Sequence, residues 1–214
     1  MNWINKDTEI YCSFAETAGN TGCQMMNTSF HYHGLNKIYK SFSVRDIESA
    51  VNAVLTLGIK GFAITMPYKV QVLKYVHGME DSVKEIGAAN TVINTNNRLR
   101  AYNTDEYATT KFLQQYDDGK KLYIIGNGGY SRAVQYSAKQ CGFDIKVITR
   151  DDWGEIESIK NSIIYNCTPI EIEEKIHLSN HYINCSTKST TGKRLANLQA
   201  SRQFQLYTGL EFPL

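Results

Sequence analysis

A glycine-rich segment in the second half of the chain has the residue types and surroundings of a phosphate-binding turn. The apolar run 122–125 predicts a short buried strand directly before Gly126-Asn127-Gly128-Gly129. A helical pattern over 130–140 and a second strand over 145–149 follow. Strand, turn, helix and returning strand together have the length of one βαβ unit, about 30 residues. The segment therefore predicts a turn that binds the phosphates of a dinucleotide.

Each residue type in this turn has a physical reason. Gly126 suits a sharp turn off the strand, Gly128 lets backbone amides approach a pyrophosphate, and the small Ser131 lets the helix pack close to the strand. The helix N-terminus adds N–H donors and the positive end of its dipole. A glycine-rich turn without a ligand is the competing interpretation. The predicted contacts are Gly126, Asn127, Gly128, Gly129, Tyr130 and Ser131.

The residues at the end of the second strand bear on which dinucleotide is bound. An acidic residue at this point bonds a ribose 2′-hydroxyl and favours NAD, whereas an arginine accepts a 2′-phosphate and favours NADP. Thr149 and Arg150 come first here, and Asp151 and Asp152 follow. Because a guanidinium matches a phosphate well, we expect Thr149 and Arg150 to contact NADP, with NAD as the alternative. The competing interpretation is a surface ion pair between Arg150 and Asp152.

Three segments in the first half of the chain place polar side chains among apolar neighbours. In chain order they read ITMPYK, IGAANTV and YNTD, and they end at Lys69, Val92 and Asp105. Each has an ordinary structural explanation when taken alone. Lys69 suits a solvated helix start, Asn90 a turn at a strand edge, and Asp105 the N-cap of the next helix.

In this order before a dinucleotide turn, the three segments resemble motifs of the shikimate/quinate dehydrogenase family, and the resemblance covers about 10–213. ITMPYK is similar to the family motif VTxPxK, which implies that Lys69 is catalytic and that Thr65 contacts the substrate. IGAANTV is similar to IGAxNT, which implies that Asn90 binds substrate hydroxyls. YNTD is similar to NTD, which implies that Asp105 is the second catalytic residue.

Further matches lie in the second half of the chain. GNGGYSRA resembles the family's nucleotide turn, GxGGxxxA. NCTP resembles the N-x-T-P segment beside the nicotinamide, which implies that Asn166 and Thr168 contact the cofactor. The run over 198–209 resembles the family's C-terminal helix motif, which implies that Gln199 is a substrate contact on a helix that returns to the first domain.

The resemblance implies an NADP-dependent oxidoreductase of the shikimate dehydrogenase type, which serves aromatic amino acid biosynthesis. The implied reaction is reversible hydride transfer between NADPH and 3-dehydroshikimate or a related cyclic hydroxy acid. The residue types suit this chemistry, because a lysine can bond the reacting oxygen while an aspartate holds the same hydroxyl. Neutral Thr, Asn and Gln side chains can bond several ring hydroxyls.

Two departures from the family pattern leave other interpretations open. The family's Ser-x-Ser-Pro run, which grips the substrate carboxylate, is replaced by Asn20-Thr21-Gly22-Cys23, where Asn20 and Thr21 are the expected donors. The second half is also several tens of residues shorter than is typical. The alternative is a catalytically silent family member that binds a small acid or nucleotide. A folate-type dehydrogenase also uses a lysine, but NTD and Gln199 fit it poorly.

Alternating strands and helices must position these groups. We expect strands at 9–14, 39–44, 61–65, 90–94, 99–102, 122–125, 145–149, 162–166 and 182–185, and helices at 23–33, 45–57, 69–76, 106–116, 130–140 and 194–207. This alternation predicts a two-domain α/β fold. We expect a mixed-sheet substrate-binding and catalytic domain over 1–104, with a helix in 193–214 packing back on it. A shortened Rossmann-type domain with a parallel sheet is expected over 105–192, and its first strand follows a linker-like turn at 117–119.

The composition is that of an ordinary globular protein, and 214 residues allow two modest domains. A net charge of +2 without a basic run argues against a nucleic-acid surface. No run approaches a membrane span, and no secretory pattern opens the chain. The five cysteines and His31-Tyr32-His33 lack the spacing of a metal site, so we expect no metal. We expect a reduced cytoplasmic monomer or homodimer whose partner is a small cyclic hydroxy acid.

Overall fold

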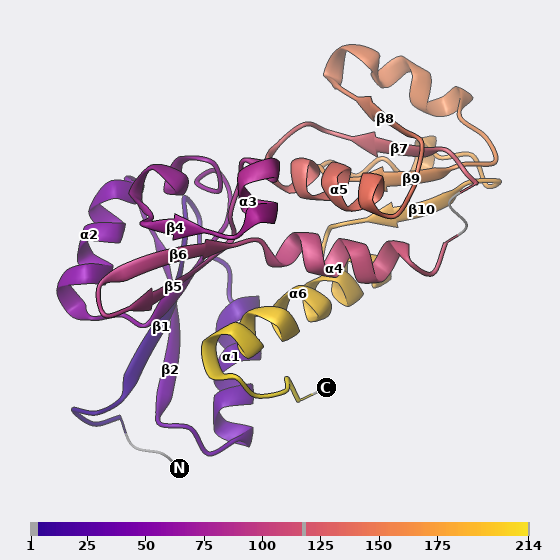
Figure 1. Ribbon diagram of the computed structural model, residues 1–214. Helices are drawn as coiled ribbons and strands as arrows, with labels where there is room; N and C mark the ends of the chain where they lie inside the picture. Colours follow the sequence, from indigo (N-terminus) through magenta and orange to yellow (C-terminus); the bar gives the residue numbers. More distant parts are fainter. Residues whose placement is uncertain (1–3, 117–118, 214) are drawn as a thin grey trace. The chain divides into compact units, whose positions relative to one another are not determined.

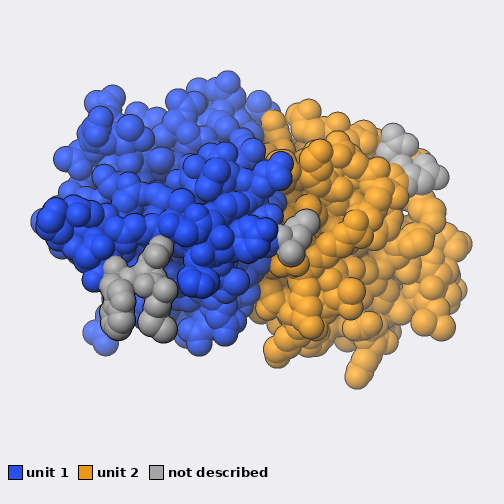
Figure 2. Space-filling view, turned by 90° about the horizontal axis from the view of Figure 1, so that it is seen from below, with its two compact units in different colours: residues 1–104, 200–214 blue, residues 105–199 orange. Residues whose placement is uncertain are grey.

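The computed structural model describes residues 4–116 and 119–213, which form two separate sheets with their helices (Figure 1). Residues 1–104 with 200–214 make up one compact unit, here unit 1, and residues 105–199 make up unit 2 (Figure 2). The predicted α/β fold, with one mixed and one parallel sheet, is confirmed. The two aspartates of the turn predicted at 117–119 lie outside the described residues.

Unit 1 is built on a six-stranded mixed sheet. Its strands are β1 (Glu9–Ala15), β2 (Lys37–Ser43), β3 (Gly61–Ile64), β4 (Gly78–Met79), β5 (Thr91–Thr95) and β6 (Arg98–Tyr102). Its helices are α1 (Thr21–Tyr32), α2 (Ile47–Leu57), the 3₁₀ helix η1 (Gln71–Tyr75), α3 (Asp81–Ile86) and the end of α6 (Thr190–Thr208). The strand order is β2-β1-β3-β5-β6-β4, and only β5 runs antiparallel to its neighbours among the described strands.

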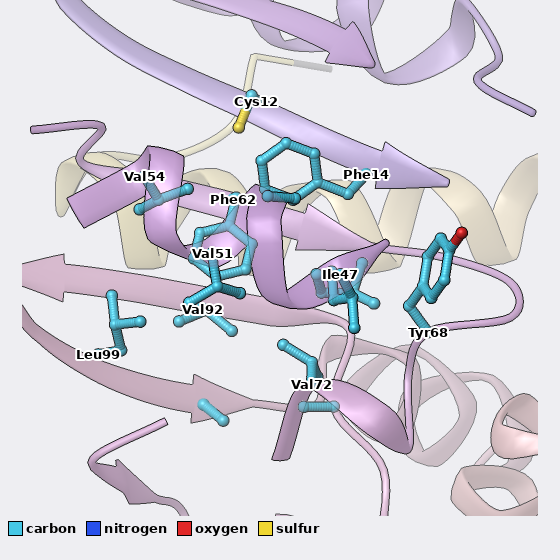
Figure 3. Packing of buried hydrophobic residues seen from close by; sticks show 14 of the residues in the cluster. Cys12, Phe14, Ile47, Val51, Val54, Phe62, Tyr68, Val72, Val92 and Leu99 are labelled. Atoms are coloured by element: carbon cyan, nitrogen blue, oxygen red, sulfur yellow. The ribbon is translucent and has the colours of Figure 1, made fainter. Parts of the chain in front are cut away.

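The two faces of this sheet carry separate apolar clusters. On one face, Val51 and Val54 of α2 pack against Phe62 of β3 (Figure 3). On the other face, Phe30 of α1 and Phe204 of α6 share a second cluster with strand residues of β1 and β2. The period of 3–4 residues in α2 and the alternation along β1 are the sequence patterns that bury these faces.

Local sequence features set the ends of several elements. Asp46 begins α2, because its carboxylate accepts the Ser49 backbone N–H at 2.7 Å. Gly58 ends α2 in the left-handed region, with φ of 66°. Asn96 and Asn97, with φ of 50° and 62°, connect β5 to β6 as a two-residue hairpin turn requires.

The segment after β3 differs from the sequence prediction. The prediction of a helix over 69–76 is wrong, because 66–70 form turns and only Gln71–Tyr75 is helical. The Lys69 carbonyl accepts the Ala89 N–H at 2.8 Å, so a tertiary bond replaces the bond of an α-helix. The two-residue strand β4 and the six-residue helix α3 were not predicted, since neither is long enough to show a period.

Unit 2 contains a four-stranded parallel sheet with the order β10-β9-β7-β8. Its strands are β7 (Leu122–Ile125), β8 (Ile145–Ile148), β9 (Ile163–Asn166) and β10 (His181–Asn184). Its helices are α4 (Thr104–Leu113), α5 (Gly129–Gln140), the 3₁₀ helices η2 (Arg150–Ser158) and η3 (Glu173–Lys175), and the first part of α6. Strand β7, helix α5 and strand β8 form the βαβ unit predicted around the glycine turn.

The two faces of the unit 2 sheet are covered unequally. On one face, Leu113 of α4, Val134 of α5 and Leu195 of α6 enclose an apolar cluster with the strands. On the other face, Ile148 of β8 packs with Ile156 of η2, and the cover consists of η2 and the segment 172–176. The short connections of this half of the chain therefore leave one face protected by 3₁₀ turns rather than by α-helices.

Two further features concern the described residues as a whole. No helix among 4–116 and 119–213 combines the length and the hydropathy needed to cross a membrane. Within the same ranges, no group of three or more His, Cys, Asp or Glu side chains is arranged to hold a metal ion.

We expect Phe62→Ala to lower the free energy of unfolding by about 3–5 kcal/mol, because Phe62 is fully buried and its removal leaves a cavity. Urea unfolding followed by circular dichroism measures the change. Leu57→Ala is the matched control, since Leu57 ends α2 and is 68% exposed. Such a surface change is usually worth less than about 0.5 kcal/mol. Equal losses in both variants would contradict the central place of Phe62 in this core.

Candidate active site

The side chain of Asn90 lies at the centre of a buried hydrogen-bond network in unit 1. It is 3% exposed and directly precedes β5. Its Oδ1 accepts the Thr104 backbone N–H at 2.8 Å and the Thr91 hydroxyl at 3.0 Å, and its Nδ2 donates to Thr104 Oγ1 at 3.0 Å. These bonds connect the start of β5 to the first residue of α4. Asp105 is the next residue of α4, so Asn90 helps to fix the backbone from which the Asp105 carboxylate extends.

Lys69 is positioned by its own backbone and by the preceding tyrosine. The Lys69 carbonyl accepts the N–H of Ala89, the residue before Asn90. Tyr68 is buried, and its hydroxyl donates to the Val44 carbonyl at 2.7 Å. The Lys69 side chain is half-buried. The structure therefore brings the main chains of Lys69 and Asn90 together, as neighbours within one hydrogen-bonded segment.

Three other predicted substrate contacts lie at exposed positions of unit 1. Thr65 follows the end of β3, and Asn20 and Thr21 lie at the start of α1. Asn20 makes no side-chain cap, and the first turn of α1 has no acidic residue, so its N–H groups are suited to an anion. Cys23 lies in the first turn of α1, and its Sγ accepts the Ser41 backbone N–H at 3.1 Å. The donors left for an anion at this point are therefore Asn20, Thr21 and the helix N-terminus.

Gln203 is a buried member of the network that the sequence analysis missed. Its side chain is 3% exposed, and its Nε2 donates to Thr91 Oγ1 at 2.7 Å. Thr91 donates in turn to Asn90, so two successive hydrogen bonds connect α6 to the Asn90 amide. The predicted residue Gln199 lies one turn earlier on the same face of α6 and is half-buried. The i, i+4 spacing of these two glutamines is the sequence feature from which Gln203 was predictable.

Within unit 2, Asp105 lies near the helix that follows the glycine turn. Asp105 is 6% exposed in the first turn of α4, and Tyr130 lies in the first turn of α5. Burial raises the pKa of Tyr130 well above its usual value, and Tyr165 and Cys167 add to this effect. The Asp105 carboxylate raises the pKa of Tyr130 as well, so the two groups are within electrostatic reach. The hydroxyls of Tyr130 and Tyr165 are 2.9 Å apart.

The glycine turn has the shape that a phosphate group requires. Gly126 has φ of 98°, and a Cβ at this position would lie 2.8 Å from Thr168 Cγ2, so glycine is required there. Ser131 Oγ donates to the Gly126 carbonyl at 2.6 Å and fixes α5 against the turn. Gly128 is the N-cap of α5, with open space where a Cβ would be, and Asn127 before it is exposed. Because α5 has neither a side-chain cap nor an acidic residue in its first turn, its N–H groups are suited to phosphate.

The residues after β8 form a capping box at the start of η2. Thr149 Oγ1 donates to the Asp152 carboxylate at 2.8 Å, and the Thr149 backbone N–H donates to it at 3.3 Å. These bonds from Thr149 hold the pKa of Asp152 below its usual value. Arg150 is exposed and makes no ion pair within the described part of the chain, so the alternative of an Arg150–Asp152 pair is wrong. Its guanidinium is left for another anion.

Asn166 shapes the segment that packs against Gly126. Its Oδ1 accepts the backbone N–H of Thr168 at 2.9 Å and the hydroxyl of Thr168 at 2.8 Å. Its Nδ2 donates to the Ile170 carbonyl at 2.9 Å and to the Tyr182 hydroxyl at 3.1 Å. These four bonds use both amide hydrogens and both lone pairs of the oxygen. Asn166 therefore affects the glycine turn by holding Thr168 in its position against Gly126.

Comparison with known proteins gives one consistent family. The profile of the shikimate dehydrogenase substrate binding domain matches residues 21–92. A shikimate dehydrogenase-like protein of Haemophilus influenzae is 31% identical, over 96% of this chain and 92% of that protein. A shikimate dehydrogenase (NADP(+)) of Pyrococcus furiosus is 34% identical, over 62% of this chain and only 51% of that enzyme. A solved shikimate 5-dehydrogenase-like protein matches with a TM-score of 0.83 and 29% identity, over 99% of this chain and 95% of that one.

We expect Gly126→Ala to lower the melting temperature, because a side chain there is strained at φ of 98° and meets Thr168 Cγ2 at 2.8 Å. The cost is roughly 1–3 kcal/mol. Gly128→Ala is the matched control, since Gly128 has φ of −84° and open space around its missing Cβ. Thermal unfolding of both variants measures the difference. A Gly126→Ala protein as stable as Gly128→Ala would contradict the close packing of the turn against Thr168.

Proposed function

Because this chain belongs to the shikimate dehydrogenase family, as the motifs indicated, we propose that it is an NADP-dependent oxidoreductase. The proposed reaction is reversible hydride transfer between NADPH and 3-dehydroshikimate or a related cyclic hydroxy acid. The observation that carries this proposal is the hydrogen-bond network of Asn90, which joins the segment holding Lys69 to the residue before Asp105. The name of the Pyrococcus relative, shikimate dehydrogenase (NADP(+)), supports the choice of cofactor.

We assign substrate binding and catalysis to residues 1–104 with 193–214, and nucleotide binding to 105–192. Lys69 and Asp105, which is the first residue of the second range, act on the proton at the reacting oxygen. The Lys69 ammonium donates a hydrogen bond to the ketone oxygen and transfers a proton to it as the ketone is reduced. Asp105 accepts a hydrogen bond from the hydroxyl that results and orients it. NADPH, when bound, supplies the hydride.

The nucleotide is assigned to the glycine turn and to the residues after β8. The uncapped start of α5 and the open space at Gly128 support a pyrophosphate position against the N–H groups of Gly128, Gly129 and Tyr130. The exposed Arg150, which has no acidic partner among the described residues, supports a 2′-phosphate contact and therefore NADP over NAD. Thr149 and Thr168 complete the assigned contacts, and Asn166 holds Thr168 in place.

The substrate is assigned to polar groups on unit 1 and α6. Asn90 Nδ2 gives one of its two hydrogens to Thr104, and we assign the second to a hydrogen bond with a ring hydroxyl of the substrate. Thr65 and Gln199 are the other proposed hydroxyl contacts. Asn20 and Thr21, at the uncapped start of α1, are proposed to bind the carboxylate in place of the family's serine pair. We propose that the protein works in the cytoplasm as a monomer or homodimer.

We expect shikimate-dependent reduction of NADP⁺ to fall by roughly 100- to 10,000-fold in Lys69→Ala, because the variant lacks the proton donor at the reacting oxygen. The assay follows nicotinamide absorbance with shikimate and then with quinate. Lys74→Ala, which removes an exposed lysine five positions further along the same segment, should keep the wild-type rate. If the folded wild-type protein turns over neither acid, the proposal fails, and a silent family member that binds a small acid or nucleotide becomes the better explanation.

We expect Arg150→Gln to raise KM for NADP⁺ roughly 10- to 100-fold while KM for NAD⁺ changes little, because charged hydrogen bonds to a 2′-phosphate are worth about 1.5–3 kcal/mol. Steady-state kinetics with each nucleotide measures both constants. Lys160→Gln is the control for the loss of an exposed positive charge elsewhere on unit 2. An equal rise for both nucleotides would show that Arg150 does not read the 2′-phosphate.

A further inference from the structure

Two cysteines that are distant in the sequence are the first residues after two neighbouring strands of unit 2, with Cys167 after β9 and Cys185 after β10. In the parallel pair β9–β10, the Cα atoms of Asn166 and Asn184 are register partners. The Cys185 backbone N–H donates to the Asn166 carbonyl at 3.1 Å, which continues the register by one step. The next pair is therefore Cys167 with Cys185. Neighbouring strands lie about 4.8 Å apart, which is within the range of roughly 4.4–6.8 Å between the Cα atoms of a disulfide.

The side chains of these two cysteines lie on the same face of the sheet. Tyr165 and Ile183 are register partners two positions earlier, and both belong to the apolar cluster under α5. Because side chains alternate along a strand, Cys167 and Cys185 return to that face, and both pack against the same cluster. The Cys185 Sγ lies 4.0 Å from the carbonyl oxygen of Thr168, the residue after Cys167. The Cys185 sulfur therefore lies near the backbone that directly follows Cys167.

The pair lies beside the glycine turn. A Cβ built at Gly126 would lie 3.9 Å from the Cβ of Cys167. Both cysteines are near enough to Tyr130 to act on its phenol, as Asp105 does. Both are half-buried, so they remain open to a small reagent. Cross-linking them would therefore act on the segment that packs against the turn.

The other cysteines differ from this pair. Cys12 is fully buried, and burial raises the pKa of its thiol far above the usual range, which suppresses the reactive thiolate. Burial also raises the pKa of Cys141. The sulfur of Cys23 is occupied by hydrogen bonding to Ser41. Among the described residues, the aligned pair is the best placed for thiol–disulfide chemistry.

We propose that Cys167 and Cys185 form a reversible dithiol–disulfide pair, and that its oxidation weakens binding at the adjacent glycine turn. The oxidant is a low-molecular-weight disulfide such as oxidised glutathione. One cysteine thiolate attacks it and releases one glutathione, and the other thiolate attacks the resulting mixed disulfide and releases the second. The two cysteines lose two electrons and two protons, and the small disulfide gains them. The effect on binding rests on the proposed nucleotide site, whereas the pairing of the cysteines does not.

The pairing is tested by mass spectrometry. The folded protein is incubated with oxidised glutathione, free thiols are alkylated, and the trypsin digest is analysed. The sequence places Cys167 and Cys185 in separate tryptic peptides, 161–175 and 176–188, each with a single cysteine. We expect these peptides to be joined, without retained glutathione, and to separate on treatment with dithiothreitol.

Two variants sharpen this test. Cys185→Ser should leave Cys167 carrying glutathione, because the resolving thiol is gone, whereas the control Cys141→Ser should still form the link. Separate glutathione adducts on both cysteines of the wild-type protein, or links between other cysteines, would overturn the proposal.

The effect on binding is tested by titrating NADP⁺ into the reduced and the cross-linked protein. We expect the cross-link to weaken binding by about tenfold or more, since small displacements at a positioned site have effects of this size. The double variant Cys167→Ser with Cys185→Ser should not respond to the oxidant. Equal affinity in both states would overturn the effect on binding. A cross-linked pair in a protein that binds NADP⁺ in neither state would instead refute the proposed cofactor while supporting the thiol pair.

Discussion

The buried amide of Asn90 is the interaction on which the proposed chemistry of unit 1 depends. Its oxygen accepts hydrogen bonds from the first backbone N–H of α4 and from the hydroxyl of Thr91. The Thr91 hydroxyl in turn accepts a hydrogen bond from the side chain of Gln203 on α6. An amide with both donors and acceptors can join segments that an apolar residue could only bring near one another. Its buried oxygen accepts hydrogen bonds from both Thr91 and Thr104, so the loss of either partner would remove one connection between these segments. The network therefore fixes the backbone on either side of Asn90 more firmly than packing alone would.

Much of the fold was predictable because its elements have clear periods or end signals. The apolar repeat of α2 lies between Asp46 and Gly58, and the Asn96-Asn97 turn identifies the hairpin of β5 and β6. The elements that were missed lack such patterns: β4 and α3 are too short, and the segment of Lys69 exchanges a helical bond for one to Ala89. That exchange depends on contact between residues twenty positions apart, which no local pattern contains.

In the candidate site, too, some features were predictable from the sequence and others were not. The order of the motifs predicted Lys69, Asn90, Asp105 and the glycine turn, and their assigned roles remain proposals. The requirement for glycine at Gly126 has a cause outside its own motif, because Thr168, two residues after the neighbouring strand β9, occupies the space that a Cβ would need. The alignment of Cys167 with Cys185 is equally invisible in the sequence, since it follows from the register of β9 and β10. Pairing between parallel strands is set by tertiary structure, so residue spacing alone predicts none of these contacts.

The unequal cover of the unit 2 sheet has a thermodynamic consequence. The face that carries Ile148 is protected by 3₁₀ turns, which contribute fewer backbone hydrogen bonds and less buried surface than α-helices would. Local opening of the fold is therefore expected to start on this side, at a smaller free-energy cost than opening of the face under α5. A ligand held by the same unit stabilises the closed form by mass action. Because the proposed nucleotide site lies on unit 2, bound nucleotide is expected to reduce both local opening of this unit and its cleavage by proteases.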